Sequence, residues 1–131
     1  MNKLFLILAA LFGGLAVIAG AMLAHSLKPI MPEAAREIYE TAVRYQFYHV
    51  FALLACGMLA EKFPAMAVRR AGNFFISGIL LFSGSLYIIS AMITSGIRVP
   101  LFIGILTPAG GICLIAGWAF LAASFRTKTI S

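Results

Sequence analysis

The chain has 131 residues, of which 63% are hydrophobic and only 11% are charged. A soluble domain has about 25% charged residues, so this composition excludes a water-soluble globular protein. The formal net charge of +6 does not indicate a nucleic-acid partner, because the basic residues lie mostly at the ends of apolar stretches and form no stripe with interleaved aromatic residues.

Four long apolar stretches cover residues 4–27, 43–60, 71–95 and 101–124. About 20 apolar residues in a helix cross the ~30 Å hydrocarbon core of a bilayer. Three stretches have that length outright, and the second reaches it only if the polar turns with Arg44, Gln46 and His49 enter the membrane. The sequence therefore predicts an all-α fold, a four-helix transmembrane bundle, as a single integral-membrane domain over residues 1–131.

The first stretch is predicted to be a retained span rather than a cleaved leader. It runs from Leu4 to Ala24, which is longer than the ~7–15 apolar residues of a signal peptide. Gly13 and Gly20 lie seven residues apart and share one helix face. Small residues let helices approach closely in lipid, so this face is predicted to pack against a neighbouring helix.

A short amphipathic interfacial helix is predicted between spans 1 and 2. Residues 30–41 place three glutamates after Pro32 and alternate apolar with charged side chains at helical spacing. This helix is expected to lie at the membrane surface and to run on into the second span. Glu40 and Arg44 are four residues apart with the acid first, which is the favourable order for a helical ion pair.

The last two spans are predicted to be antiparallel neighbours, because the turn between them covers only residues 95–100. Pro108 lies inside the fourth span and predicts a kink there. The proline and several small residues are predicted to line close helix contacts in the two spans: Gly84, Gly104, Pro108, Gly111 and Gly117.

Polar and ionisable side chains gather at the predicted outer end of the first two spans. His25 ends the first span, and a polar run begins the second: Glu40, Arg44, Tyr45, Gln46, Tyr48 and His49. The intervening loop returns the chain to the same side, so the two histidines are expected at similar depth. Ionisable groups inside a membrane are costly and are therefore candidates for a functional site.

This cluster is compatible with three interpretations. In the first, the side chains form an interfacial belt and a hydrogen-bonded structural clasp, with Arg44 paired to Glu40. In the second, they line a polar site for a proton, an ion, a quinone or a lipid headgroup, because histidine exchanges protons near neutral pH. In the third, His25 and His49 ligate haem or a metal ion.

No catalytic or cofactor-binding pattern occurs in the sequence. The chain contains no aspartate, and the hydrolase, zinc-protease and nucleotide-binding motifs are absent. Cys56 and Cys113 lie in apolar spans without zinc-ligand spacing and are interpreted as small hydrophobic residues. Ser83 and Ser85 are expected to bond backbone carbonyls, and Trp118 fits an inner aromatic belt. We therefore expect no enzymatic activity, no cofactor and no metal.

Several short segments occur in one order along most of the chain: Gly20-Ala21 with Ala24-His25-Ser26-Leu27, Tyr45-Gln46-Phe47-Tyr48-His49, Phe82-Ser83-Gly84-Ser85-Leu86-Tyr87, Thr107-Pro108-Ala109-Gly110-Gly111 and Gly117-Trp118. Together they resemble the domain of unknown function 423 family, which includes transmembrane protein 256. The family's first motif has an aromatic residue and a glycine where this chain has Met22 and Leu23. The resemblance implies a small four-span, multi-pass membrane protein and supplies no activity.

The resemblance and the lack of an organelle leader imply a bacterial inner-membrane protein, and the basic residues favour an orientation with both ends of the chain in the cytoplasm. Six of them fall on the side of the chain ends: Lys3, Lys62, Arg69, Arg70, Arg126 and Lys128. Four fall on the other side: Lys28, Arg36, Arg44 and Arg98.

The leading functional hypothesis is a non-enzymatic structural or accessory component of a membrane assembly, in contact with the lipid bilayer and packed into a homo-oligomer or a larger complex. This hypothesis rests on the many helix faces with small residues and on the scarcity of side chains that could carry out catalysis. The alternative is a small carrier or channel for a proton or small solute, with the polar cluster at the outer end of spans 1 and 2 as its site.

Overall fold

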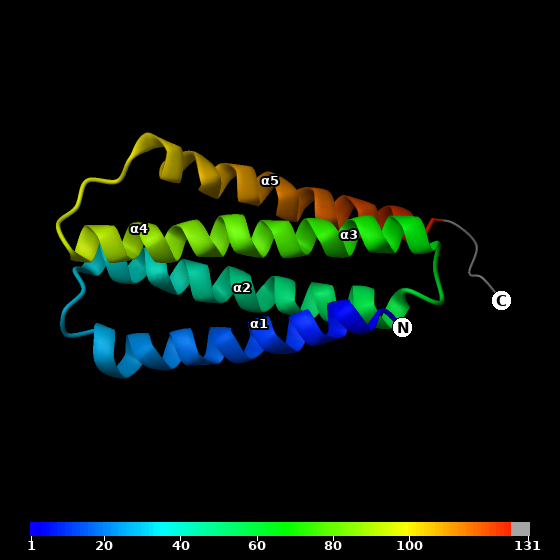
Figure 1. Cartoon of the computed structure of the whole chain (residues 1–131), viewed down its shortest axis with the longest axis horizontal. Coiled ribbons are helices and arrows are strands. Elements are labelled where there is room, and N and C mark those ends of the chain that lie inside the picture. The colour runs from blue at the N-terminus through cyan, green and yellow to red at the C-terminus, as the bar shows by residue number, and fades with distance from the viewer. Residues whose placement is uncertain (127–131) are drawn as a thin grey trace.

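The computed structural model describes residues 1–126, which form four antiparallel helical rods joined by short turns (Figure 1). The rods are α1 (Lys3–Met22) with a π-helical turn (Leu23–Leu27), α2 (Glu33–Leu59), α3 (Ala65–Gly78) joined by a second π-helical turn (Ile79–Ser83) to α4 (Gly84–Thr94), and α5 (Leu101–Ser124). No strand occurs within the described residues. The predicted all-α four-helix bundle is confirmed.

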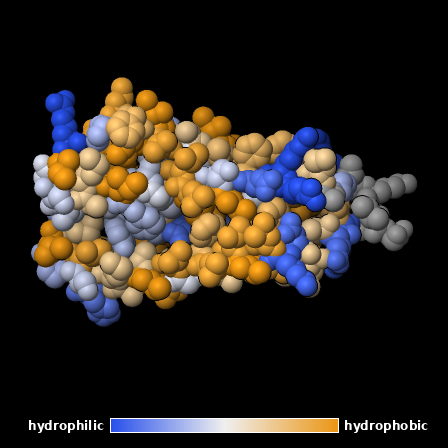
Figure 2. Space-filling model, in the orientation of Figure 1, coloured by the Kyte–Doolittle hydropathy of each residue, from blue (hydrophilic) through white to orange (hydrophobic). Residues whose placement is uncertain are grey.

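Three rods are long and apolar enough to cross a membrane: Lys3–Leu27, Met66–Thr94 and Leu101–Ser124. Only 17% of the most apolar stretch of the first rod, and 17% of that of α5, is buried inside the bundle. Figure 2 shows largely hydrophobic long sides, with hydrophilic residues gathered towards the two ends. Apolar surface of this extent is typical of helices that face lipid chains.

The central helix of the bundle is α2. It packs against α1 on one side and against α3 and α4 on the other, as Figure 1 shows. It is not among the three most apolar rods, because its first half carries five charged residues: Glu33, Arg36, Glu37, Glu40 and Arg44. The enclosed position suits this composition, since neighbouring helices can supply hydrogen-bond partners that lipid cannot.

The amphipathic helix predicted over residues 30–41 runs on into the second span, as expected. The segment is helical from Glu33 and continues without a break to the end of α2. Ala35 is fully buried, and Tyr39 is only 8% exposed in an apolar cluster with Met31. Because this apolar face packs against α1 and α4, the segment is part of the helical bundle.

Glycines mark the closest approaches between helices. An added Cβ at Gly117 of α5 would lie 2.6 Å from the ring of Phe75 on α3. At Gly110 an added Cβ would collide with the backbone of Leu81 and Phe82, in the second π-helical turn. Three further glycines press similarly closely against side chains: Gly57, Gly72 and Gly78.

The small face predicted for the first span packs against α2. An added Cβ at Gly13 would lie 3.4 Å from Val50, and one at Gly20 would lie 3.8 Å from Val43. These are ordinary van der Waals distances, so both positions lie at the α1–α2 contact without demanding glycine.

The small residues predicted to pack in spans 3 and 4 behave differently from one another. An added Cβ at Gly111 would meet the ring of Phe82 at 3.8 Å, whereas Gly84 and Gly104 have nothing within 4 Å. Pro108 lies inside α5 and is exposed. The prediction that Gly84 and Gly104 line contacts within the bundle is therefore corrected, because a seven-residue spacing defines a face without saying what that face meets.

Candidate functional site

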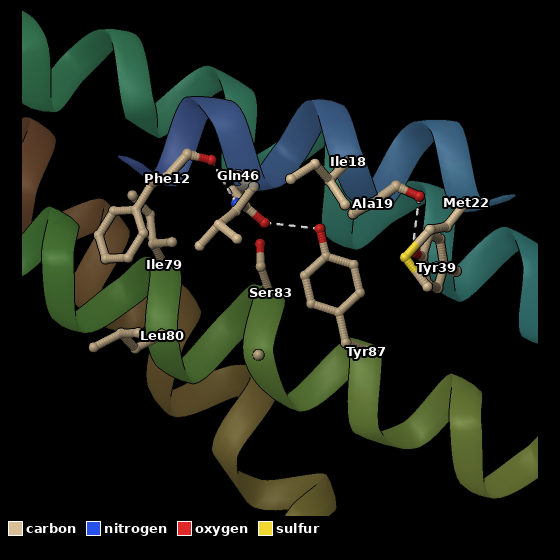
Figure 3. A pocket seen from close by; sticks show the side chains of 12 residues that line it. Phe12, Ile18, Ala19, Met22, Tyr39, Gln46, Ile79, Leu80, Ser83 and Tyr87 are labelled. Atoms are coloured by element: carbon tan, nitrogen blue, oxygen red, sulfur yellow. Dashed lines mark hydrogen bonds between the residues drawn. The ribbon is translucent and has the colours of Figure 1, made fainter. Parts of the chain in front are cut away.

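A hydrogen-bonded chain links α1, α2 and α4 near the middle of the bundle (Figure 3). Gln46 of α2 is 5% exposed, and its Nε2 donates to the carbonyl of Phe12 on α1 at 2.7 Å. Its Oε1 accepts from the hydroxyl of Tyr87 on α4, also at 2.7 Å. A buried amide is costly in an apolar bundle unless it is bonded, so these contacts hold three helices in one register.

Two more hydroxyls bond backbone carbonyls of a neighbouring helix. Tyr39 donates to the carbonyl of Ala19 at 2.8 Å, and Ser83 donates to that of Ala42 at 2.8 Å. Ser85 donates to a carbonyl of its own rod at 2.9 Å. The prediction that the two serines bond carbonyls is confirmed.

A groove of about 440 Å³ opens beside this chain of bonds. Its floor includes Tyr39, Gln46 and Tyr87, and its walls are apolar side chains of α1 and the α3–α4 rod, as Figure 3 shows. The polar groups of the floor are already bonded within the protein. The groove therefore presents a mainly apolar surface, and its polar groups act first as a structural clasp.

His49 joins α2 to α5 on another face of the bundle. The ring is 5% exposed, with Nδ1 2.6 Å from the carbonyl of Tyr45 and Nε2 3.1 Å from Nε1 of Trp118. A carbonyl can only accept and an indole N–H can only donate, so His49 is the neutral tautomer with its hydrogen on Nδ1. Both ring nitrogens are occupied, and neither is free to ligate a metal or haem iron in this arrangement.

Aromatic rings surround His49. The ring centroids of Phe75 and Trp118 lie 5.8 Å and 6.0 Å away, and that of Tyr45 lies 6.1 Å away. A cavity of about 530 Å³ borders this group and is also lined by Tyr48. Trp118, interpreted from the sequence as a belt residue, is thus also part of a specific contact between helices.

His25 and His49 do not form one site. His25 is exposed in the π-helical turn at the end of α1, and the packing of α1 on α2 places it near the level of Ile38. From there to His49 is about 11 residues, or ~16 Å along the helix axis. The expectation that the two histidines lie at similar depth is wrong. The rod of α2 begins at Glu33, well before the predicted start of the second span at residue 43, so His49 lies far inside that rod.

The other predicted site residues are also divided. Glu40 and Arg44 line a hollow between α1 and α2, and no ion pair joins them within residues 1–126. Tyr45 and Tyr48 border the cavity beside His49. The predicted cluster therefore falls into separate places: the exposed end of α1, the α1–α2 hollow, the Gln46 clasp and the His49 group.

Sequence reasoning missed the partners that complete these contacts. Tyr87 lies 41 residues from Gln46, and Trp118 lies 69 residues from His49. The one local signal in the sequence is that Tyr87 and Trp118 lie in apolar spans. The hydroxyl or N–H group of such a side chain needs a hydrogen-bond partner, but the sequence does not show which residue that partner is. Among the residues that the structure describes, no three His, Cys, Asp or Glu side chains come together as a metal site.

Comparison with known proteins places these residues in a family. The model for proteins of unknown function DUF423 matches residues 19–111. The chain is similar to the UPF0382 membrane protein YwdK of Bacillus subtilis, with 38% identity over 120 residues that cover 91% of this chain and 93% of the relative. No solved structure matches.

Two further relatives come from other bacteria. A UPF0382 membrane protein of Haemophilus influenzae is 37% identical over 131 residues, covering 99% of this chain and 100% of the relative. The UPF0382 inner membrane protein YgdD of Escherichia coli is 32% identical over 128 residues, covering 97% of this chain and 93% of the relative. The region matched by the family model contains Gln46, His49 and Tyr87 and ends before Trp118.

Proposed function

This chain belongs to the DUF423 family of membrane proteins, and from that premise we propose that it is a non-enzymatic structural or accessory component of a membrane assembly. The observation that carries the proposal is a second face of small residues on α1, which no helix of the described residues covers.

The two small faces of α1 have different surroundings. The face with Gly13 and Gly20 packs against α2. The second face is exposed and carries four small residues, Ala10, Gly14, Ala21 and Ala24, with the larger Val17 between Gly14 and Ala21. An added Cβ at Gly14 would meet nothing within 4 Å. Such a face lets the backbone of another transmembrane helix approach closely, which is a main source of helix association in lipid.

The internal polar groups support a non-enzymatic role. The hydrogen bonds between helices already engage the polar groups of Gln46, Tyr87 and His49. The alternative of a proton or solute carrier has less support, because it needs one continuous polar site. His25 and His49 lie at different depths, and Arg44 lies in a different hollow from His49.

A photo-crosslinking residue at Gly14, compared with one at Leu15, tests the proposal in native membranes. Both positions are exposed at nearly the same depth of α1, but Leu15 borders the groove beside Gln46 and not the small face. We expect a discrete protein adduct from position 14, identified by mass spectrometry as a second copy or as another membrane protein. Adducts to lipid alone from both positions would argue against the proposal.

Purification in mild detergent provides an independent check. An accessory subunit is expected to retain a partner, or a second copy, at fixed stoichiometry. A chain that migrates alone at every detergent concentration would redirect attention to the carrier alternative and to transport assays.

The same reasoning extends to location and orientation. We propose an inner-membrane location with both chain ends in the cytoplasm, because the side with the chain ends holds the larger share of Lys and Arg. Lys128, which contributes to that count, lies outside the described residues. Labelling of single cysteines at Lys62 and Arg98 by a membrane-impermeant reagent in intact cells should modify only the Arg98 position.

A further inference from the structure

A cleft between α1 and α2 gathers three basic side chains at the end of the bundle where the α1–α2 turn lies. It consists of two adjoining hollows of about 240 Å³ and 260 Å³. Lys28 and Arg36 line one hollow and Arg44 lines the other, while Glu40 borders both. With three positive groups and one negative group, this α1–α2 cleft carries a net positive charge.

The charges of the cleft are not neutralised by one another. No ion pair joins Glu40 to Lys28, Arg36 or Arg44 within the described residues. The Nε of Arg36 is buried and has no hydrogen-bond partner in the protein. Arg36 also lines the cleft without a carboxylate paired to it, so the other N–H groups of its guanidinium can donate to an anion that supplies acceptor oxygens.

The cleft also has apolar walls. Leu23 and Val43 lie beside the charged groups, and Gly20 leaves room between the two helices. Lys28 follows the π-helical turn, where its N–H bonds the carbonyl of Leu23 at 3.0 Å. The charged end of the cleft is therefore at the end of the apolar rod Lys3–Leu27, which is the depth of lipid headgroups.

We propose that the α1–α2 cleft binds an anionic phospholipid, with the phosphate at Arg36 and Lys28 and an acyl chain along Leu23 and Val43. A planar guanidinium offers several N–H donors in a geometry that matches phosphate oxygens. Arg44 lies deeper on α2 and lines the adjoining hollow, and an arginine side chain is long enough to reach towards the headgroup level. A lipid is a better occupant than a free phosphate, because the apolar walls continue from the charged end into the membrane.

The test uses the purified, delipidated full chain in a neutral detergent, with binding followed by native mass spectrometry and by thermal unfolding. Phosphatidylglycerol is the probe, and phosphatidylcholine and inorganic phosphate are the comparison ligands. The matched control is Arg98→Gln, since Arg98 is exposed in the turn at the same end of the bundle and does not line the cleft.

We expect phosphatidylglycerol to bind the wild-type chain and the Arg98→Gln variant equally, and to bind Arg36→Gln about tenfold more weakly. Glu40→Gln removes the one negative group, so it should bind phosphatidylglycerol more tightly than the wild type. This gain keeps the test decisive even if Arg36→Gln fails to fold. The proposal is overturned by equal binding of phosphatidylcholine, by an equal loss in Arg98→Gln, by unchanged or weaker binding in Glu40→Gln, or by complete competition from inorganic phosphate.

Discussion

The indole N–H of Trp118 donates a hydrogen bond to Nε2 of His49 across 3.1 Å. This bond ties α5, which otherwise packs on α3 and α4, to the central helix α2. Because an indole can only donate, the bond exists only while Nε2 of His49 carries no proton. Two residues that the sequence assigned to different interfaces of the membrane are thus partners inside one bundle.

Loss of the indole donor should destabilise the bundle. Trp118→Phe leaves the acceptor nitrogen of a nearly buried His49 unbonded, which is expected to lower the free energy of unfolding by about 1–3 kcal/mol. Unfolding in a titration with sodium dodecyl sulfate measures this change. Tyr48→Phe is the control, since Tyr48 is exposed and should change stability by less than about 0.5 kcal/mol. Equal effects of the two variants would contradict the assigned bond.

The bond between Gln46 and Tyr87 should appear as an energetic coupling. Gln46→Leu and Tyr87→Phe each remove one side of a 2.7 Å contact. A double-mutant cycle is therefore expected to give a coupling free energy of about 0.5–1.5 kcal/mol, as for other hydrogen bonds between membrane helices. Strictly additive single-variant effects would show that the two side chains do not interact in the folded protein.

Two glycines of α5 should respond oppositely to alanine. Gly110→Ala places a methyl group against the backbone of Leu81 and Phe82, which cannot move aside as a side chain can. The expected loss is about 1–3 kcal/mol of unfolding free energy. Gly104→Ala enters open space and should be neutral or slightly stabilising, because alanine favours the helix by about 1 kcal/mol. A larger loss for Gly104→Ala than for Gly110→Ala in the monomer would refute the described packing of α5 on the second π-helical turn.

The two histidines should also separate in their effects. His25→Ala removes an exposed side chain and is expected to change the unfolding free energy by less than about 0.5 kcal/mol. His49→Ala breaks two hydrogen bonds and opens space among aromatic rings, so its cost is expected to reach at least about 1 kcal/mol. The single tryptophan of the chain reports the same difference, because only His49→Ala should shift its emission. Matching losses in both variants would restore the idea of one shared histidine site.

Much of the fold follows from local properties of the chain. The lengths of the apolar stretches and the glycine and proline turns predict four rods, and the structure has four. The carbonyl bonds of Ser83 and Ser85 were also predictable, because a hydroxyl in an apolar helix has few other partners. The two π-helical turns were not, since one extra residue in a turn leaves no distinct composition.

The polar cluster was the least predictable feature. The expectation that His25 and His49 lie at similar depth assumed that the second span begins near residue 43, whereas the rod of α2 begins at Glu33. Three residues of one polar run, Arg44, Gln46 and His49, then point to different neighbours, because successive side chains on a helix are turned by about 100°. Only the packing of α1, α4 and α5 around α2 decides which neighbour each one meets.

Composition, apolar lengths and short motifs were thus enough to predict that this protein is a helical membrane protein and that it belongs to a family of small membrane proteins. Those properties depend on hydrophobicity and helix length, which are summed along the chain. Only the packing of the helices shows that Gln46 bonds Phe12 and Tyr87, that His49 bonds Trp118, and that Arg36 lines a cleft without an ion-pair partner among the described residues. These contacts join residues of separate helices, and their geometry depends on register and rotation, which no local pattern encodes.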